Sequence, residues 1–263
     1  MSAMTDTDLW LRRFHPAEEA GGRLLCLPHA GGSASYFFAV SRALSPEVDV
    51  LAVQYPGRQD RRREPCVDSV PELADRLVAA ILGADTPVAD RPITIFGHSL
   101  GATLGFEVAR RLEAEGVTPT ALFASGRRAP HRHRVERTHL LDDAGLLADV
   151  RALAGTDSAL LADDDVLAMV LPAIRGDYRA AECYEYRPGP PLRCPIHALV
   201  GDRDPKVTVA EAAAWREHTD GEFELGVYPG GHFFLDNHVP DILRRIRTHI
   251  RMRTNAAACT ERK

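Results

Sequence analysis

The sequence predicts an α/β fold, with a mostly parallel central sheet, helices on both faces and a helical lid inserted late in the chain. Two observations lead to this expectation. Short, continuous apolar runs alternate with helical patterns, which is typical of parallel strands buried on both faces. The alternation stops between Gly126 and about Gly189, where only helical patterns occur, and then resumes. We therefore expect a single domain, residues 1–263, in which one insertion lies over the sheet.

The apolar runs have the length of buried strands and define the sheet. The predicted strands are Arg23–Leu27, Val48–Val53, Ile93–Phe96, Thr120–Ala124, Ile196–Val200 and Glu222–Tyr228. Trp10–Phe14 adds either an edge strand or an arm laid on the body. Helical patterns separate the strands, so the order before the insertion is β-α-β-α-β-α-β.

Five helices are predicted outside the insertion. They cover about Ala34–Leu44, Ser69–Leu82, Leu100–Glu115, Val209–Glu217 and Pro240–Arg251. Ser69 is a good N-cap for the second helix, because Pro71 and Glu72 follow it in the first turn. The residues expected on the inner face of that helix are Leu73, Leu77, Ala80 and Ile81.

The insertion, about residues 127–189, divides the core into residues 9–126 and 190–252. Its helical patterns cover Leu140–Ala154, Ala159–Leu161 and Asp164–Tyr186. A kink is expected at Pro172, because proline removes a helical hydrogen bond. Segments above the carboxyl edge of a sheet commonly gate active sites, so we interpret the insertion as a lid. The polar, alanine-rich tail, residues 253–263, is expected to be disordered.

Composition excludes several classes of protein. The net charge of −5 argues against nucleic acid as the main partner, since nucleic-acid binding usually calls for a basic domain. Five widely spaced cysteines without a Cys-x-x-Cys pair indicate reduced thiols and no disulfide or zinc framework, and Cys26 and Cys194 are read as small core residues. No apolar run approaches the roughly 20 residues of a membrane span, so a cytoplasmic protein is expected. Asp163-Asp164-Asp165 lacks the glycine and distal glutamate of a calcium loop and is interpreted as a helix N-cap.

The central motif follows the strand Ile93–Phe96. There Gly97-His98-Ser99-Leu100-Gly101 leads into a helical pattern, which is the context that a Gly-x-Ser-x-Gly nucleophile elbow requires. The turn is strained, so the residues that flank the serine must be small where strand and helix pass closely, and glycine carries no Cβ. Ser99 would project its hydroxyl above the carboxyl edge of the sheet. The alternative is a glycine-rich turn with a solvated serine.

A serine hydroxyl needs a positioned base that is itself oriented by a carboxylate. His232 follows the last strand in a Gly-Gly-His loop and is the candidate base and then acid. Asp204 follows the preceding strand and is the candidate carboxylate, because it sits deeper in its loop than the competing Asp202. Serine, acid and histidine then occur in the chain order of this kind of site, each at the end of a strand.

An oxyanion hole needs two backbone donors. The N–H of Leu100 is one, and the loop His29-Ala30-Gly31-Gly32 is placed to supply the N–H of Ala30 as the other. His29 is interpreted as a brace for this loop, because no second ligand lies at metal spacing from it. His98, inside the elbow, is expected to pack or to bond locally.

A basic stretch begins the insertion. It contains Arg127, Arg128, His131, Arg132, His133, Arg134 and Arg137. Such a run is usually a solvated face. Because the chain is acidic overall, it would alternatively form a basic rim that steers an acidic partner towards the pocket.

These motifs together resemble the type II (editing) thioesterases of polyketide and non-ribosomal peptide pathways, which belong to the α/β-hydrolase superfamily. The matching segments span nearly the whole chain. They are Pro28–Ser33, Tyr55–Arg58, Gly97–Gly101, Ser125–Pro130, Gly201–Asp204 and Gly231–Phe234. The elbow is common to many hydrolases, whereas the combination of His-Ala-Gly-Gly, Pro-Gly-Arg and Gly-His-Phe-Phe is much narrower.

The resemblance implies Ser99, Asp204 and His232 as a catalytic triad, with Ala30 and Leu100 as oxyanion donors. It implies a serine thioesterase whose substrate is an acyl group on the phosphopantetheine arm of an acyl or peptidyl carrier protein. No cofactor or metal of its own, no nucleic acid and no membrane are expected, and the protein is expected to be a monomer. Two alternatives stay open: an esterase, acyltransferase or cyclase with the same triad, and a hydrolase-like protein that binds without turnover.

Overall fold

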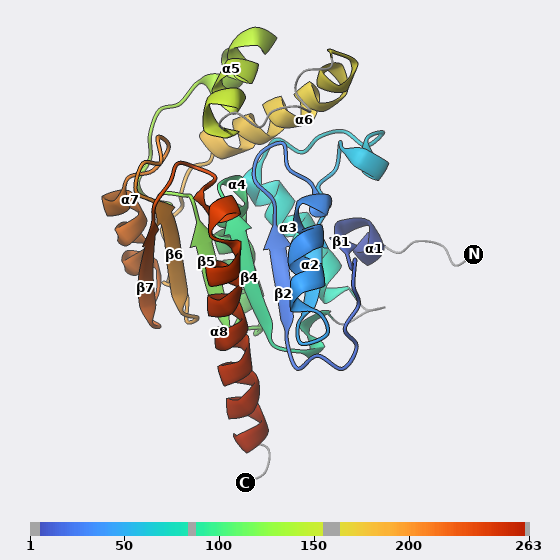
Figure 1. Cartoon of the computed structure of the whole chain (residues 1–263), viewed down its shortest axis with the longest axis vertical. Helices are drawn as coiled ribbons and strands as arrows, with labels where there is room; N and C mark the ends of the chain where they lie inside the picture. Colours follow the sequence, from blue (N-terminus) through green and yellow to red (C-terminus); the bar gives the residue numbers. More distant parts are fainter. Residues whose placement is uncertain (1–5, 84–87, 155–163, 261–263) are drawn as a thin grey trace, which may run out of the picture.

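Figure 1 shows the computed structural model of the chain, which describes residues 6–83, 88–154 and 164–260. In these ranges seven strands form one sheet in the order β1-β3-β2-β4-β5-β6-β7. The strands are β1 (Leu11–Arg12), β2 (Arg23–Leu27), β3 (Asp49–Val53), β4 (Ile93–His98), β5 (Ala121–Ser125), β6 (Ile196–Gly201) and β7 (Phe223–Tyr228). β1 pairs antiparallel with β3, and the other pairings are parallel. The predicted strands are confirmed, and the N-terminal segment is an edge strand.

Helices cover both faces of the sheet (Figure 1). The α-helices of the described ranges are α1 (Asp6–Trp10), α2 (Phe38–Leu44), α3 (Val70–Leu82), α4 (Leu100–Ala114), α5 (Asp143–Ala154), α6 (Asp164–Glu182), α7 (Val209–Ala213) and α8 (Val239–Thr260). In the view of Figure 1, α2 and α8 lie in front of the sheet, and α3 and α4 lie behind it. Short 3-10 turns extend two of the helices: Ala34–Phe37 leads into α2, and Ala214–His218 continues α7.

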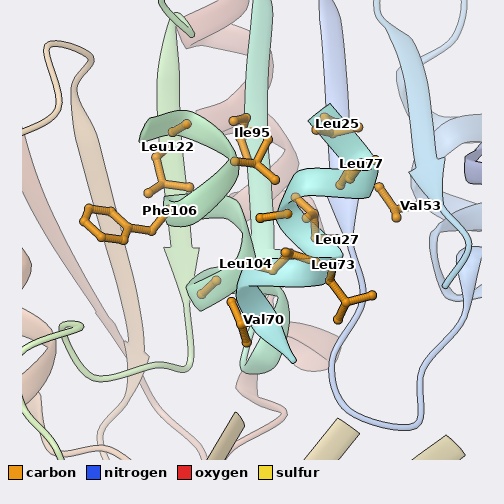
Figure 2. Packing of buried hydrophobic residues seen from close by; sticks show 14 of the residues in the cluster. Leu25, Leu27, Val53, Val70, Leu73, Leu77, Ile95, Leu104, Phe106 and Leu122 are labelled. Atoms are coloured by element: carbon orange, nitrogen blue, oxygen red, sulfur yellow. The ribbon is translucent and has the colours of Figure 1, made fainter. Parts of the chain in front are cut away.

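Each central strand serves two cores, because successive side chains point to opposite faces of a sheet. In β2, Leu25 and Leu27 join the core with α3 and α4, whereas Leu24 and Cys26 join the core with α2 and α8. Figure 2 shows the first of these cores, where side chains of the helices meet those of the strands. A fully buried leucine contributes about 1.5–3 kcal/mol to stability. Two helical layers therefore explain why the strands are apolar throughout.

The helix α3 forms as its sequence predicts. The Ser69 side chain accepts a hydrogen bond from the backbone N–H of Glu72 at 3.4 Å, which satisfies one free donor of the first turn. The predicted inner-face residues are all buried, namely Leu73, Leu77, Ala80 and Ile81.

The helices α5 and α6 lie above the end of the sheet where β4 passes into α4 (Figure 1). The insertion is helical, as predicted, and Pro172 lies inside α6. The α6 helix ends at Glu182 and does not reach Tyr186. Beyond its end, Tyr184 donates a hydrogen bond to Glu107 of α4 at 2.7 Å, so the chain leaves the helix to pack on the body. The predicted helical segment Ala159–Leu161 lies outside the described residues, as does Asp163.

The C-terminal helix corrects one prediction. Residues 253–263 were expected to be disordered, but α8 continues to Thr260. Alanine has the highest helix propensity, and extending an existing helix avoids the cost of nucleation. An alanine-rich tail therefore prolongs the helix that precedes it. Although α8 is long, none of the helices in the described ranges is both long and apolar enough to span a membrane.

Candidate active site

The turn after β4 has the strained geometry of a nucleophile elbow. Ser99 has φ +55° and ψ −117°, outside the regions that non-glycine residues normally adopt. Its backbone N–H donates to the carbonyl of Ser125 at 2.8 Å. A Cβ on Gly97 would lie 2.1 Å from the carbonyl oxygen of Gly101, and a Cβ on Gly101 would lie 2.1 Å from that of Leu27. Strand and helix can therefore pass this closely only where both residues are glycine.

His232 and Asp204 form a buried pair. The Nδ1 of His232 lies 2.9 Å and 3.1 Å from the two carboxylate oxygens of Asp204, and the side chains are 3% and 0% exposed. The backbone N–H of Lys206 also donates to Asp204, at 2.8 Å, which holds the carboxylate in place. A carboxylate on Nδ1 fixes the imidazole tautomer and leaves Nε2 for the reacting group.

Asp202, the competing carboxylate, has a different role. It is exposed, and it accepts a hydrogen bond from the backbone N–H of Gly230 at 2.8 Å. That hydrogen bond holds the pKa of Asp202 below its ordinary value. Asp202 therefore shapes the loop that carries His232, whereas Asp204 contacts the imidazole itself.

Ser99 and His232 both line a cavity of about 1050 Å³ beneath the lid. Ala30 and Gly31 form part of the same wall. The two lid helices supply its apolar lining, which includes Val150, Leu153, Met169, Val170, Ala173 and Ile174. The structure thus brings the predicted serine, histidine and glycine loop to one cavity, which opens between the sheet edge and the lid.

The two predicted oxyanion donors come from two different segments, the elbow after β4 and the loop after β2. Leu100 begins α4, and the first N–H groups of a helix have no intrahelical acceptor. Within the described residues, no hydrogen bond occupies the N–H of Ala30. Both groups are therefore available to a negatively charged oxygen.

Two neighbouring histidines are structural, as predicted. The ring of His29 packs edge-on against Tyr36 and Phe233, with centroids 4.8 and 4.9 Å away. Burial lowers its pKa to about 3, with smaller contributions from His232 and Arg58, so His29 stays neutral and braces the loop. His98 is fully buried, and its Nδ1 lies 3.0 Å from the Ser125 hydroxyl, so it bonds locally.

The sequence interpretation missed one component of the site, which is a buried ion pair. Arg58 contacts the two carboxylate oxygens of Asp177 at 2.6 and 2.8 Å, and the backbone N–H of Gly31 donates to Asp177 at 2.7 Å. A signal for it exists in the helix: Val170, Ile174 and Asp177 share one face at i, i+4 and i+7. A carboxylate on such an apolar face must have a buried partner.

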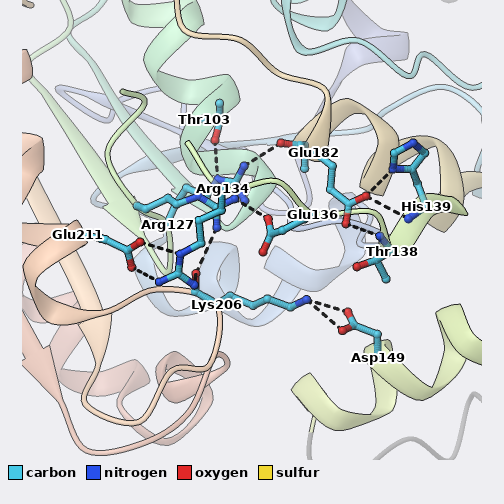
Figure 3. A network of polar contacts seen from close by, with 12 residues as sticks. Thr103, Arg127, Arg134, Glu136, Thr138, His139, Asp149, Glu182, Lys206 and Glu211 are labelled. Carbon is cyan, nitrogen blue, oxygen red and sulfur yellow. Dashed lines mark hydrogen bonds and ion pairs between the residues drawn. The ribbon is translucent and has the colours of Figure 1, made fainter. Parts of the chain in front are cut away.

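The basic stretch is largely paired within the protein (Figure 3). Arg127 donates to the Thr103 hydroxyl at 3.0 Å and to the carbonyl of Ala181 at 2.9 Å. The arginine–carboxylate pairs of this stretch are Arg128 with Glu136, Arg132 with Glu217 and Arg134 with Glu211, and His131 also lies near Glu217, at 3.4 Å. The idea of a free basic rim is therefore wrong for these arginines, because three of them pair with carboxylates, and Arg127, which lines the cavity, is held by its bonds to Thr103 and Ala181.

The comparisons with known proteins agree with this geometry. The thioesterase domain family matches residues 22–250. Thioesterase PikA5 of Streptomyces venezuelae is 53% identical over 246 residues, which cover 93% of this chain and 86% of that protein. The solved structure of the type II thioesterase BorB, from the borrelidin biosynthetic cluster, is 53% identical with a TM-score of 0.86, and the match covers 92% of this chain and 98% of that chain.

A more distant structure agrees as well. RedJ, a thioesterase from the prodiginine biosynthetic pathway in Streptomyces coelicolor, is 37% identical with a TM-score of 0.82, and the match covers 89% of this chain and 88% of that chain. The elbow, the buried histidine–carboxylate pair and the helical lid thus occur within a shared sequence and a shared fold. The chain belongs to the thioesterase family and has the α/β-hydrolase fold.

Proposed function

We propose that this protein hydrolyses acyl thioesters held on the phosphopantetheine arm of carrier proteins in a polyketide or non-ribosomal peptide pathway, either editing stalled acyl groups or releasing a product. The observation that carries the proposal is the buried Asp204–His232 pair, which shares one cavity with a strained Ser99. The type II thioesterase BorB, similar over nearly the whole chain, supports the choice of a carrier-bound substrate. A cytoplasmic location and a monomeric state stay predictions.

The first half of the reaction acylates the serine. His232 takes the proton of Ser99 through Nε2, and the oxygen attacks the thioester carbon. The N–H groups of Ala30 and Leu100 stabilise the oxyanion that forms; losing one such donor typically costs about 2.7–4 kcal/mol of barrier. The C–S bond then breaks, and the imidazolium returns its proton to the departing sulfur. A thiol with a pKa of about 8–9 is a good leaving group, so this step needs little acid help.

The second half releases the acyl group. His232 removes a proton from a water molecule, and the hydroxide attacks the Ser99 ester. The same two N–H groups hold the second oxyanion. When that intermediate collapses, Ser99 recovers its proton from His232 and the free carboxylic acid leaves. Every bond broken is replaced, and the protein ends in its starting state without a cofactor of its own.

The lid supports an acyl substrate. The cavity of about 1050 Å³ is at the upper end of the range for ligand sites, and its apolar lining comes from α5 and α6. An aliphatic chain placed there would bury its surface while its thioester lies near Ser99.

The test compares three substrates by kcat/KM: an acyl-carrier protein, the same acyl group on N-acetylcysteamine and its p-nitrophenyl ester. We expect the carrier-bound thioester to be preferred, and Ser99→Ala to lower kcat by about 10⁴–10⁶-fold. An advantage for the simple ester would favour a small-molecule esterase instead. Transfer of the acyl group to an added alcohol or amine would favour an acyltransferase, and full function in Ser99→Ala would favour a binding protein.

A further inference from the structure

One contact joins the lid to the catalytic loops in an unexpected way. Asp177 belongs to the lid helix α6, yet its side chain is 1% exposed and its carboxylate bonds only with groups of the body in the described structure. Two of its three hydrogen bonds come from Arg58, and the third comes from the backbone N–H of Gly31. Gly31 directly follows Ala30, the proposed oxyanion donor.

The contact with Gly31 is close as well as polar. Gly31 has φ +76°, a conformation that favours glycine, and a Cβ at this position would lie 2.8 Å from the Cγ1 of Ile174 on α6. The loop backbone at Gly31 therefore packs directly against the Ile174 side chain of the lid helix. Any displacement of α6 must disturb Gly31.

Fixing the N–H of Gly31 constrains Ala30. The peptide unit between Ala30 and Gly31 is planar, so aiming its N–H at Asp177 also sets the direction of the Ala30 carbonyl. On either side, the Tyr55 hydroxyl donates to the carbonyl of Pro28 at 3.0 Å, and Arg58 donates to the carbonyl of Gly32 at 3.0 Å. With its neighbours held in this way, Ala30 retains little freedom to turn its own N–H.

We propose that Asp177 is a positioning residue of the reaction: through it, the lid helix α6 sets the orientation of the Ala30 N–H. The oxyanion hole is then complete only while α6 lies against Gly31. This inference rests on the proposed function, because it gives Ala30 the role of donor. It extends that function by making the lid part of the catalytic apparatus as well as the wall of the acyl pocket.

The first test is Asp177→Asn. Asparagine has nearly the same shape, but its amide must turn a donor towards Arg58 or towards Gly31, which are both donors. Complete loss of an oxyanion donor lowers kcat by about 10²–10³-fold, so a misdirected donor should lower kcat by about 10- to 100-fold. KM should change by less than about 3-fold, because the interaction is made mainly in the transition state. An unchanged kcat in this variant, together with equal kcat values in the second pair of variants, would overturn the proposal.

A second pair of variants removes the problem of an unpaired buried arginine. Arg58→Met/Asp177→Asn and Arg58→Met/Asp177→Leu both lack the ion pair, but only the first keeps an acceptor for the Gly31 N–H. With similar thermal unfolding, the asparagine variant should have a kcat about 5- to 10-fold higher than the leucine variant, on the scale of one neutral hydrogen bond. Equal kcat values would show that the hydrogen bond to Gly31 does not position the loop.

The control is a second ion pair between α6 and the body, formed by a residue two positions after Asp177. Arg179 pairs with Asp68 at 2.9 Å, and both side chains are exposed, so Asp68→Asn should leave kcat and KM unchanged. Wild type and Ser99→Ala, measured on the same acyl-carrier protein, separate the two levels of the proposal. An inactive wild type would overturn the proposed function, whereas an active wild type with equal kcat values in the two Arg58→Met variants would overturn only the role of Asp177.

Discussion

The two helices of the lid are attached to the body in different ways. The anchor of α6 is the Arg58–Asp177 pair, whose side chains are 8% and 1% exposed. The anchor of α5 is the pair of Asp149 with Lys206 at 3.0 Å, whose side chains are 27% and 23% exposed (Figure 3). The hydroxyl of Tyr178 on α6 also donates to Asp149 at 3.0 Å. α5 is thus held partly through its neighbour.

This difference indicates different roles for the two helices. Removing one partner of a buried ion pair costs about 3–5 kcal/mol, whereas an exposed pair contributes about 0–1 kcal/mol. We therefore expect α6 to behave as part of the active-site scaffold and α5 to open more easily. The cavity would then admit a substrate by movement of α5 without loss of the oxyanion loop. Three predictions test this contrast, in addition to the Ser99 and Asp177 variants.

The largest effect should come from the catalytic loop to which α5 is attached. Asp204→Asn should lower kcat by about 10⁴-fold, because asparagine no longer holds the imidazole in the required tautomer. The matched control is Asp202→Asn, which removes the charge of an exposed carboxylate but keeps an oxygen that can accept from the Gly230 N–H, and it should change kcat by less than about 5-fold. Steady-state kinetics of both variants provides the measurement. The reverse order of effects would assign the carboxylate role to Asp202.

An intermediate effect should follow from forcing α6 away from the loop. Gly31→Ala combines a positive φ with a clash against Ile174, and should cost about 2–4 kcal/mol of unfolding free energy and lower kcat about 10-fold. Gly116→Ala is the control, since Gly116 has φ +84° and no heavy atom within 4 Å of the added Cβ. It should cost only about 1 kcal/mol and leave kcat unchanged. Urea unfolding and steady-state kinetics of both variants provide the measurement. Equal losses of stability and of kcat in the two variants would contradict the close contact between Gly31 and Ile174.

The smallest effect should come from the anchor of α5. Lys206→Met removes the partly exposed pair with Asp149, and should change the unfolding free energy by at most about 1 kcal/mol and kcat by less than about 3-fold. Relative to wild type, amide hydrogen exchange in this variant should accelerate more in α5 than in α6. Lys206→Arg, which keeps the charge, is the control. A loss of kcat as large as that of Asp177→Asn would mean that both anchors act alike.

Much of the site could be predicted because its signals are local. Gly97 and Gly101 stand where a serine turn needs them, and the structure confirms that any Cβ there would clash with the backbone. The serine, the aspartate and the histidine each follow a strand of the parallel sheet. Because the carboxyl ends of these strands lie at one edge of the sheet, the three residues were expected to lie close together. The helix cap at Ser69 is a feature of four consecutive residues.

The ion pairs could not be predicted, because their partners are far apart in the sequence and local patterns relate only neighbouring residues. Arg58 and Asp177 are 119 positions apart, and the neutralising partner of Arg134, Glu211, is 77 positions away. The same limit explains why a run of arginines looked like an open basic surface.

The sequence by itself determined the parallel sheet, the helical insertion and the residues available for chemistry, because apolar periodicity and glycine act over a few neighbouring positions. The sequence also favoured Asp204 over Asp202 as the partner of His232, and the structure shows that contact. Only the tertiary structure decided that a lid carboxylate lies against the oxyanion loop. The physical reason is that a buried charge needs a partner within hydrogen-bond distance, and the packing of segments that are distant in the sequence determines which group that partner is.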